Sequence, residues 1–325
     1  LREQGGGDLG DRLPRRPLTQ LAVDYPGSTP AEFGHPTEVT PSQMSTWGVI
    51  VDGIHYSGGC PTRAGEYPFC EELVLPSYSV AKSIFGSLGL MRLERRFPGA
   101  RNQQVVDYVP ECAAHGGWSG VTLGNLLDMS SGHWTSAAAY ADEDSVAMSK
   151  EFFDEPRHAG KIAYACGHSP RRETAGRAFV YRTSDTYLLG TALAAFVRQK
   201  MGPQADLLDD VVWRDVWSVA GLSPVADFSR RTRDDVRQPF GGYGLTLLPD
   251  DVAKIGRWLN PLSASARNLL DERMWRSALQ LDAADRGLAT TADGTLLYND
   301  GFWAARIDDL PGCEVPVFVP FMSGF

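Results

Sequence analysis

The chain has 325 residues, of which 43% are hydrophobic and 22% are charged, as in a globular protein with a sizeable core. Its 31 basic and 40 acidic residues give a net charge of −9, which excludes nucleic acid as a default partner because phosphate binding needs a basic face. No apolar run approaches the ~18 residues of a membrane-spanning helix, so no membrane span is predicted.

The sequence predicts neither a metal site nor a cofactor. Its five cysteines form no C-x-x-C pair, its six histidines are scattered, and no P-loop occurs. Two interpretations of the cysteines stay open. We expect all five to be free, mostly buried thiols, and the alternative is a bridge between Cys60 and Cys70, which flank a short loop.

The N-terminal part combines a tail with a hairpin and a helix. Residues 1–40 are rich in Pro, Gly and charge and are expected to wrap the surface as loop. Two β-rich runs at 47–56 surround Asp52-Gly53, which is a strong hairpin signal. From residue 79 the apolar period becomes helical, and Pro98-Gly99 ends that helix.

The middle of the chain is mostly helical. Thr122 is expected to cap a short helix that extends to Met129, and residues 135–178 are irregular and polar. Apolar periodicity then predicts three longer helices, at 184–198, 207–219 and 249–259.

Strand signals return in the last part of the chain, at 295–298, 301–305 and 315–321. Because strands lie at both ends and helices between them, the pattern predicts an α+β fold. Its antiparallel sheet would come from about 41–95 and 240–325, with a helical region at about 96–239 inserted, in a single domain over 41–325. Residues 315–325 read as a buried strand and a turn, so we expect the domain to continue beyond Phe325.

Ser79 and Lys82 form the pattern that carries chemistry. Positions i and i+3 share one helix face, with Cβ atoms about 5–6 Å apart. A helix start disfavours a protonated lysine, and its free N–H groups can hold a developing oxyanion. A serine needs such a base to become a nucleophile. The alternative is a surface lysine one turn from a capping serine.

Five segments, in order, resemble motifs of the serine β-lactamase and penicillin-binding-protein superfamily. The likeness is to its class C-like branch, which includes D-alanyl-D-alanine carboxypeptidases, esterases and 6-aminohexanoate-dimer hydrolases. The segments are the Ser-Val-Ala-Lys run at 79–82, the run at 121–132 that contains Thr122 and ends in Ser-Ser-Gly, the run at 179–190 in which Tyr-Arg-Thr leads into Leu-Leu-Gly, the Ala-Gly-Leu-Ser-Pro run at 220–224 and the run at 240–256 that begins Phe-Gly-Gly. Together they imply a β-lactamase/transpeptidase-like fold over roughly 45–325.

The resemblance implies a role for each motif residue. Ser79 would be the nucleophile, Lys82 its base, and Tyr181 a second acid/base whose pKa of ~10 a charged Lys82 would lower. The backbone N–H of Ser79 would be one oxyanion donor, and the strand of the third motif would supply the other. Tyr181 as a packed core aromatic is the alternative.

Two departures from the family pattern stand out. Thr183 occupies the place where the lactamases have Asn, and the run can also be read as Ser184-Asp185-Thr186. No K-T-G occurs, but the run from Phe321 through Ser323 and Gly324 resembles the opening of a variant third motif.

Other residues are weaker candidates for the site. Thr183, Ser323, Gly324 and Trp134 are candidate substrate or oxyanion contacts. Tyr140 could equally line the cleft or the core, and His133 is expected to be a solvated loop residue.

We therefore expect a serine hydrolase that cleaves an amide or ester in a small-molecule or peptide-like substrate. The missing K-T-G argues against an efficient β-lactamase and for an esterase, amide hydrolase or peptidase. The rivals are a non-catalytic binding or sensor relative and an inactive gene fragment. Such relatives are often periplasmic or secreted, though some are cytoplasmic, and the oligomeric state stays open.

Overall fold

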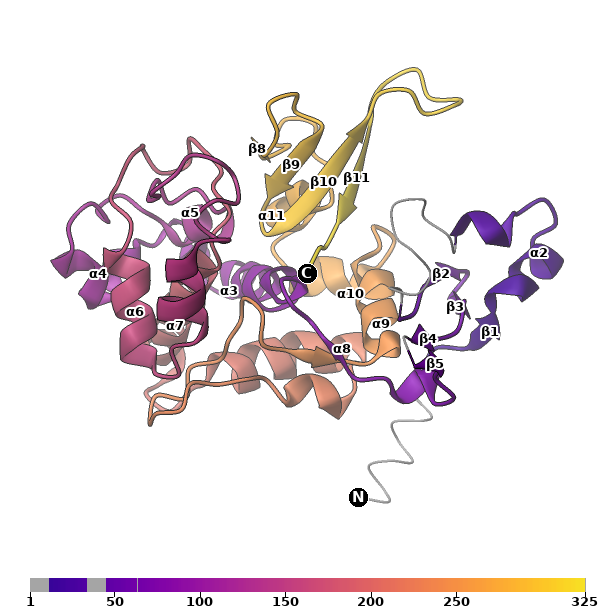
Figure 1. Ribbon diagram of the computed structural model, residues 1–325, viewed down its shortest axis with the longest axis horizontal. Coiled ribbons are helices and arrows are strands. Elements are labelled where there is room, and N and C mark those ends of the chain that lie inside the picture. The colour runs from indigo at the N-terminus through magenta and orange to yellow at the C-terminus, as the bar shows by residue number, and fades with distance from the viewer. Residues whose placement is uncertain (1–11, 34–44, 63, 325) are drawn as a thin grey trace. The chain divides into compact units, whose positions relative to one another are not determined.

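The computed structural model describes residues 12–33, 45–62 and 64–324. The chain divides into two compact units, and Figure 1 labels their helices and strands. Unit 1 holds residues up to Leu75 together with Ser218–Phe228 and Thr246–Ser263, and unit 2 holds Pro76–Trp217, Ser229–Leu245 and Ala264–Phe325. The division into a tail over 1–40 and one catalytic domain over 41–325 stays a prediction.

A three-stranded sheet forms the centre of unit 1. β2 (Gly48–Val51) pairs antiparallel with β3 (Ile54–Ser57), and β1 (Arg15–Pro17) pairs parallel with β3. The hairpin prediction is confirmed, because Asp52 and Gly53 both have positive φ, as a two-residue turn between twisted strands requires.

The expectation that residues 1–40 form only loop is wrong for the described part of that segment. After β1 come η1 (Leu18–Gln20), α2 (Leu21–Asp24) and η2 (Pro30–Phe33). Leu18 and Leu21 are buried against Tyr56 of β3. These elements are too short to show an apolar period in the sequence. The rest of the tail, 1–11 and 34–40, lies outside the described residues.

The remaining elements of unit 1 are short apart from one helix. They are β4 (Pro61–Thr62), β5 (Gly65–Glu66), η4 (Cys70–Glu72), α8 (Ser218–Ala220), η10 (Pro224–Asp227), β7 (Thr246–Leu247) and α9 (Pro249–Leu259), while β6 (Leu75–Pro76) lies at the unit boundary. The helix predicted at 249–259 is confirmed as α9, with Pro249 in its first turn, where a missing N–H costs nothing.

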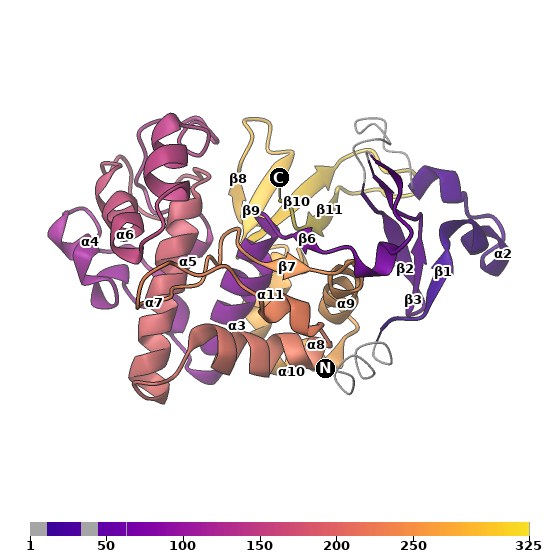
Figure 2. The ribbon, with the colours of Figure 1, turned by 60° about the horizontal axis from the view of Figure 1, so that its bottom comes forward.

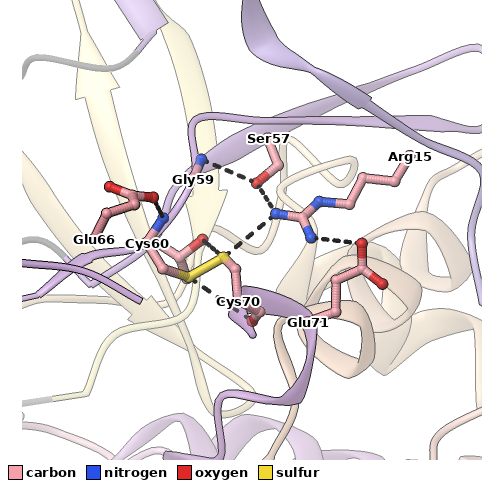
Figure 3. The surroundings of a disulfide bond; sticks show 8 residues. Arg15, Ser57, Gly59, Cys60, Glu66, Cys70 and Glu71 are labelled. Atoms are coloured by element: carbon pink, nitrogen blue, oxygen red, sulfur yellow. Dashed lines mark hydrogen bonds and ion pairs between the residues drawn. A yellow bond between two sulfur atoms is a disulfide. The ribbon is translucent and has the colours of Figure 1, made fainter. Parts of the chain in front are cut away.

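Two disulfides overturn the expectation of five free thiols. Cys60 pairs with Cys70, and Cys112 pairs with Cys166. Figure 3 shows Arg15 beside the first bridge, where its guanidinium donates to Cys70 Sγ (3.4 Å) and pairs with Glu71 (2.9 Å). The second bridge joins helices 54 residues apart in sequence, a pairing that no local signal announces. Cys313 is free and exposed.

Helices dominate unit 2. They are η5 (Lys82–Ser87), α3 (Leu88–Arg96), η6 (Ala100–Asn102), η7 (Val105–Asp107), α4 (Pro110–Ala114), α5 (Leu123–Leu127), η8 (Met148–Phe153), α6 (His158–Gly167), α7 (Thr183–Met201), η9 (Leu208–Trp217), α10 (Ala264–Leu269) and α11 (Glu272–Ala278). The predicted helices at 79, 122 and 184 are confirmed, and Thr122 caps α5 by accepting from the Asn125 N–H. The expectation that 135–178 is irregular is wrong, because η8 and α6 lie within this segment. α6 packs along α7 (Figure 2).

Unit 2 also contains an antiparallel meander in the order β11-β10-β9-β8 (Figure 1). Its strands are β8 (Leu288–Ala289), β9 (Leu296–Asn299), β10 (Phe302–Ile307) and β11 (Val317–Phe321). Trp303 lies opposite Tyr298 and Phe321, and it joins a buried cluster with Phe179 and Tyr181.

The α+β class is confirmed, with helices and antiparallel strands in the described residues. The N-terminal hairpin lies in unit 1 and the C-terminal meander lies in unit 2. The N-terminal hairpin finds its third strand in Arg15–Pro17, a segment that carried no strand signal in the sequence.

Candidate active site

Ser79 stands at the start of the helix that continues as η5 and α3. The residue before it, Tyr78, has a φ of 42°, the left-handed region that a bulky residue seldom adopts. Ser83 and Ser87, one and two turns on, donate to the carbonyls of Gly301 (2.6 Å) and Asp300 (2.5 Å). The start of this helix is therefore tied to the turn between β9 and β10.

Lys82 is buried, with 2% of its surface exposed, and its amine meets three oxygens. Its Nζ lies 2.7 Å from Ser79 Oγ, 2.8 Å from Thr183 Oγ1 and 3.0 Å from the carbonyl oxygen of Gly242. The structure thus brings the first motif, the second motif and the Gly-Gly segment to one atom.

Burial sets the protonation of this amine. Loss of hydration lowers the pKa of Lys82 to about 8, while the negative charge of Glu143 acts in the opposite direction. About half of the amine is therefore uncharged at pH 8 and roughly a tenth at pH 7, so the form that a base requires is populated.

Tyr181 is both a core aromatic and a neighbour of Ser79 and Lys82. Its ring stacks on Trp303, with centroids 5.9 Å apart, and Lys82 Nζ lies 4.9 Å from the centre of the Tyr181 ring. Its hydroxyl shares a hydrogen bond with Ser79. Burial raises the pKa of Tyr181 above its usual value, which outweighs the hydrogen bond with Ser79. The expectation of a lowered pKa is therefore wrong, and the phenol keeps its proton.

The alternative second motif, Ser184-Asp185-Thr186, contacts Arg182 through its first two side chains. Ser184 accepts a hydrogen bond from the Arg182 guanidinium (3.1 Å), and Asp185 pairs with the same side chain (3.7 Å). It is Thr183, the first residue of α7, that reaches Lys82.

Gly324 lies where only a glycine fits. A Cβ built on it would be 2.7 Å from the Ser79 nitrogen and 2.7 Å from the Ser77 oxygen. The chain after β11 therefore passes close to the backbone nitrogen of Ser79. Ser323 beside it is half-buried.

Trp134 is also half-buried, and its backbone N–H donates to the Pro170 carbonyl (3.3 Å). Among the described interactions, none joins Trp134 to Ser79 or Lys82.

The sequence did not point to Glu143, which lies at the site. Its Oε2 accepts from the Thr183 N–H (2.8 Å), and its Oε1 accepts from the Thr183 hydroxyl. The neighbouring Asp142 fixes this loop by accepting from the N–H groups of Thr135 (2.8 Å) and Ser136 (3.0 Å). An Asp-Glu-Asp run in a polar stretch reads as a solvated loop, so no local signal marks Glu143.

His133 is not a solvated loop residue. It is 2% exposed, and its ring stacks on Trp118 with centroids 4.0 Å apart. Burial lowers the pKa of His133 to about 4, so the ring is neutral near pH 7. Tyr140 is more exposed and packs against Tyr181, with centroids 5.5 Å apart.

The described residues include no group of three or more His, Cys, Asp or Glu side chains arranged to hold a metal ion. Within the same residues, every helix is too short or too polar to span a bilayer.

Comparison with known proteins identifies the fold and the family. The chain resembles a Bacillus anthracis protein provisionally named as a 6-aminohexanoate-dimer hydrolase, with a TM-score of 0.61 and 16% identity over 96% of this chain and 82% of that one. A penicillin-binding protein from Bacillus halodurans gives a TM-score of 0.57 and 16% identity over 94% and 96% of the two chains. A mutant class C beta-lactamase gives a TM-score of 0.54 and 15% identity over 84% and 74%.

These likenesses establish a β-lactamase/transpeptidase-like fold. No curated protein matches the chain significantly. The model of the Beta-lactamase family, however, matches residues 43–305, which is most of the sequence. The chain therefore belongs to the beta-lactamase family.

Proposed function

We propose that this protein is a serine hydrolase that cleaves an amide or ester through an acyl-enzyme on Ser79. The observation that carries the proposal is the buried Lys82 amine, 2.7 Å from the Ser79 hydroxyl and with a pKa lowered to about 8. An uncharged amine at that distance can accept the hydroxyl proton.

The reaction would have two halves. In the first, the Ser79 proton passes to Lys82, and Ser79 Oγ attacks the carbonyl carbon to form a tetrahedral oxyanion. The backbone N–H of Ser79, at the start of its helix, is the proposed donor to that oxyanion. The bond to the leaving group then breaks, and the leaving nitrogen or oxygen takes a proton from the Lys82 ammonium, directly or through Tyr181, which the ammonium then reprotonates.

In the second half, water attacks the acyl carbon. Its proton passes to Lys82, directly or through Tyr181; the bond between the acyl carbon and Ser79 Oγ then breaks, Oγ takes that proton back, and the carboxylic acid product leaves. The raised pKa of Tyr181 keeps the phenol protonated between these steps, so that it can pass a proton on only as it receives one from Lys82.

We infer an amide or ester other than a β-lactam as the substrate. Ser323 and Gly324 stand where the resemblance places the K-T-G motif, so a serine occupies the position of the family's carboxylate-binding lysine. One structural neighbour carries the name of an amide hydrolase, a 6-aminohexanoate-dimer hydrolase. The disulfides Cys60–Cys70 and Cys112–Cys166 support function in an oxidising compartment.

Labelling with a fluorescent fluorophosphonate tests the proposal. The wild type should be labelled, and Ser79→Ala should lose the label while it keeps its melting temperature. Ser149→Ala, at an exposed serine, is the matched control and should label like the wild type. A folded wild type that takes no label, or label that persists in Ser79→Ala, would favour the rival of a binding or sensor module.

A further inference from the structure

Glu143, Thr183 and Lys82 form a hydrogen-bonded chain that ends at Ser79. Glu143 Oε2 accepts from the Thr183 N–H at 2.8 Å, and Oε1 accepts from the Thr183 hydroxyl. The Lys82 amine donates to the same hydroxyl oxygen at 2.8 Å and to the Gly242 carbonyl at 3.0 Å. Thr183 is almost fully buried, so water does not compete for its hydroxyl.

The number of protons fixes the direction of this chain. An ionised carboxylate only accepts, and a threonine hydroxyl has a single proton to give. When that proton goes to Glu143, Thr183 Oγ1 can only accept from Lys82. The Gly242 carbonyl can also only accept. An uncharged amine has two protons, and both are now used.

What remains on the amine is its lone pair, and the remaining neighbour is Ser79 Oγ at 2.7 Å. We propose that Glu143 is a positioning residue that acts through Thr183 to keep the lone pair of Lys82 directed at the Ser79 hydroxyl. This inference rests on the proposed function, because it assigns Glu143 a part in activating that serine.

The charged and titratable groups around the hydrogen bonds of Glu143, Thr183 and Lys82 come from several elements. Lys82, Arg182 and Tyr243 lie near Glu143, and Tyr181 and Glu143 lie near Lys82. Burial raises the pKa of Glu143, while the positive charges of Lys82 and Arg182 and the bonds from Thr183 lower it. Protonation of Glu143 would put a donor where the chain needs an acceptor.

Glu143→Gln should reverse the direction of the hydrogen bonds from Glu143 through Thr183 to Lys82, with little change in the size of the side chain. The amide oxygen would take the Thr183 N–H, which leaves the amide NH₂ facing Thr183 Oγ1. The hydroxyl would then give its own proton to Lys82, and the lone pair would no longer be free for Ser79. Thr183→Asn removes the need for Glu143, because an amide oxygen accepts from Lys82 in any case.

The test is a double-mutant cycle on the rate of Ser79 labelling by a fluorophosphonate in the full chain. Glu143→Gln should lower the plateau rate about 10- to 100-fold, a part of what general-base catalysis contributes. In a Thr183→Asn background the same change should cost less than about twofold. Thr183→Ser, which keeps the hydroxyl, is the matched control and should retain the full dependence on Glu143.

A second readout separates positioning from a structural role. The negative charge of Glu143 raises the pKa of Lys82, so Glu143→Gln should move the acid limb of the labelling rate to lower pH. Spectra of protein labelled with ¹⁵N-lysine can follow the same titration without any activity, because the chain has five lysines. A structural role alone would leave the acid limb unmoved and would not respond to Thr183→Asn.

The outcomes are distinguishable. A wild type that is not labelled at Ser79 overturns the proposed function and, with it, this inference. A labelled wild type overturns the inference alone if Glu143→Gln reacts at the same rate, or if the loss is as large in the Thr183→Asn background. Melting temperatures of every variant show whether a lost rate reflects lost folding.

Discussion

Unit 2 contains two buried lysines that titrate alike but have different surroundings. Lys82 is 2% exposed and Lys161 is fully buried. Burial lowers the pKa of Lys82 to about 8 and the pKa of Lys161 to about 8. By titration alone, either amine could serve as a base near neutral pH.

The partners of the two amines differ. Lys82 meets the hydroxyls of Ser79 and Thr183, whereas Lys161 donates to the Phe152 carbonyl (2.5 Å) and the Tyr243 hydroxyl (3.1 Å). Around Lys161 lie aromatic ring centres at 4.5 to 5.9 Å, from Phe152, Phe240, Tyr243 and Tyr187. Such rings stabilise a cation but have no proton to give to an amine. A lowered pKa therefore allows a lysine to act as a base near neutral pH. Its neighbours determine whether there is a proton for it to accept.

Replacing each lysine by methionine should separate the two environments most strongly. Lys82→Met removes the base beside Ser79, and the fluorophosphonate labelling rate should fall by about 10²- to 10⁴-fold. Lys161→Met keeps an apolar chain of similar length among the rings, and labelling should change by less than about threefold. Equal losses in both variants, with melting temperatures intact, would contradict the comparison.

Replacing the tyrosine beside each lysine should also cost more activity at the Lys82 site than at the Lys161 site. The losses should be smaller than those of the lysine variants. Tyr181 shares a hydrogen bond with Ser79, so Tyr181→Phe should slow turnover of an ester substrate about 10- to 100-fold. Tyr243 bonds to Lys161, so Tyr243→Phe should cost at most a few-fold. Steady-state kinetics measures both. A larger loss in Tyr243→Phe would mean that the Lys161 environment takes part in the chemistry.

The features that the sequence predicted are those that short segments encode. The Asp52-Gly53 turn, the Thr122 cap and Pro249 in the first turn of α9 each depend on a few neighbouring residues. The approach of Lys82 to Ser79 is of this kind too, because it spans one helical turn.

The features that the sequence missed depend on tertiary packing. Lys82 meets Thr183 and Gly242 across 101 and 160 residues, and the pairing of Cys112 with Cys166 arises only when α4 packs against α6. No local pattern fixes such pairs. α6 itself was missed because Lys161 lies on its buried face, where a helical apolar pattern would have a hydrophobic residue.

The smallest expected effect concerns stability against pH. The pKa of Lys161 is lowered from 10.5 to about 8 on folding, so between these values the unfolded chain binds a proton that the folded chain does not. The free energy of unfolding should therefore rise with pH from 8 to 9.5, by at most about 1.4 kcal/mol per pH unit for this lysine. Below pH 8 both states are protonated and the contribution is constant.

Lys161→Met should remove this rise and leave the similar contribution of Lys82, so the slope between pH 8 and 9.5 should fall by about half. Urea unfolding at several pH values measures it, and Lys150→Met, at a side chain that is 73% exposed, is the control. A slope that Lys161→Met leaves unchanged would mean that Lys161 titrates in the folded protein as it does in the unfolded chain. The two lysines would then differ in titration as well as in partners, and burial alone could not explain the lowered pKa of Lys82.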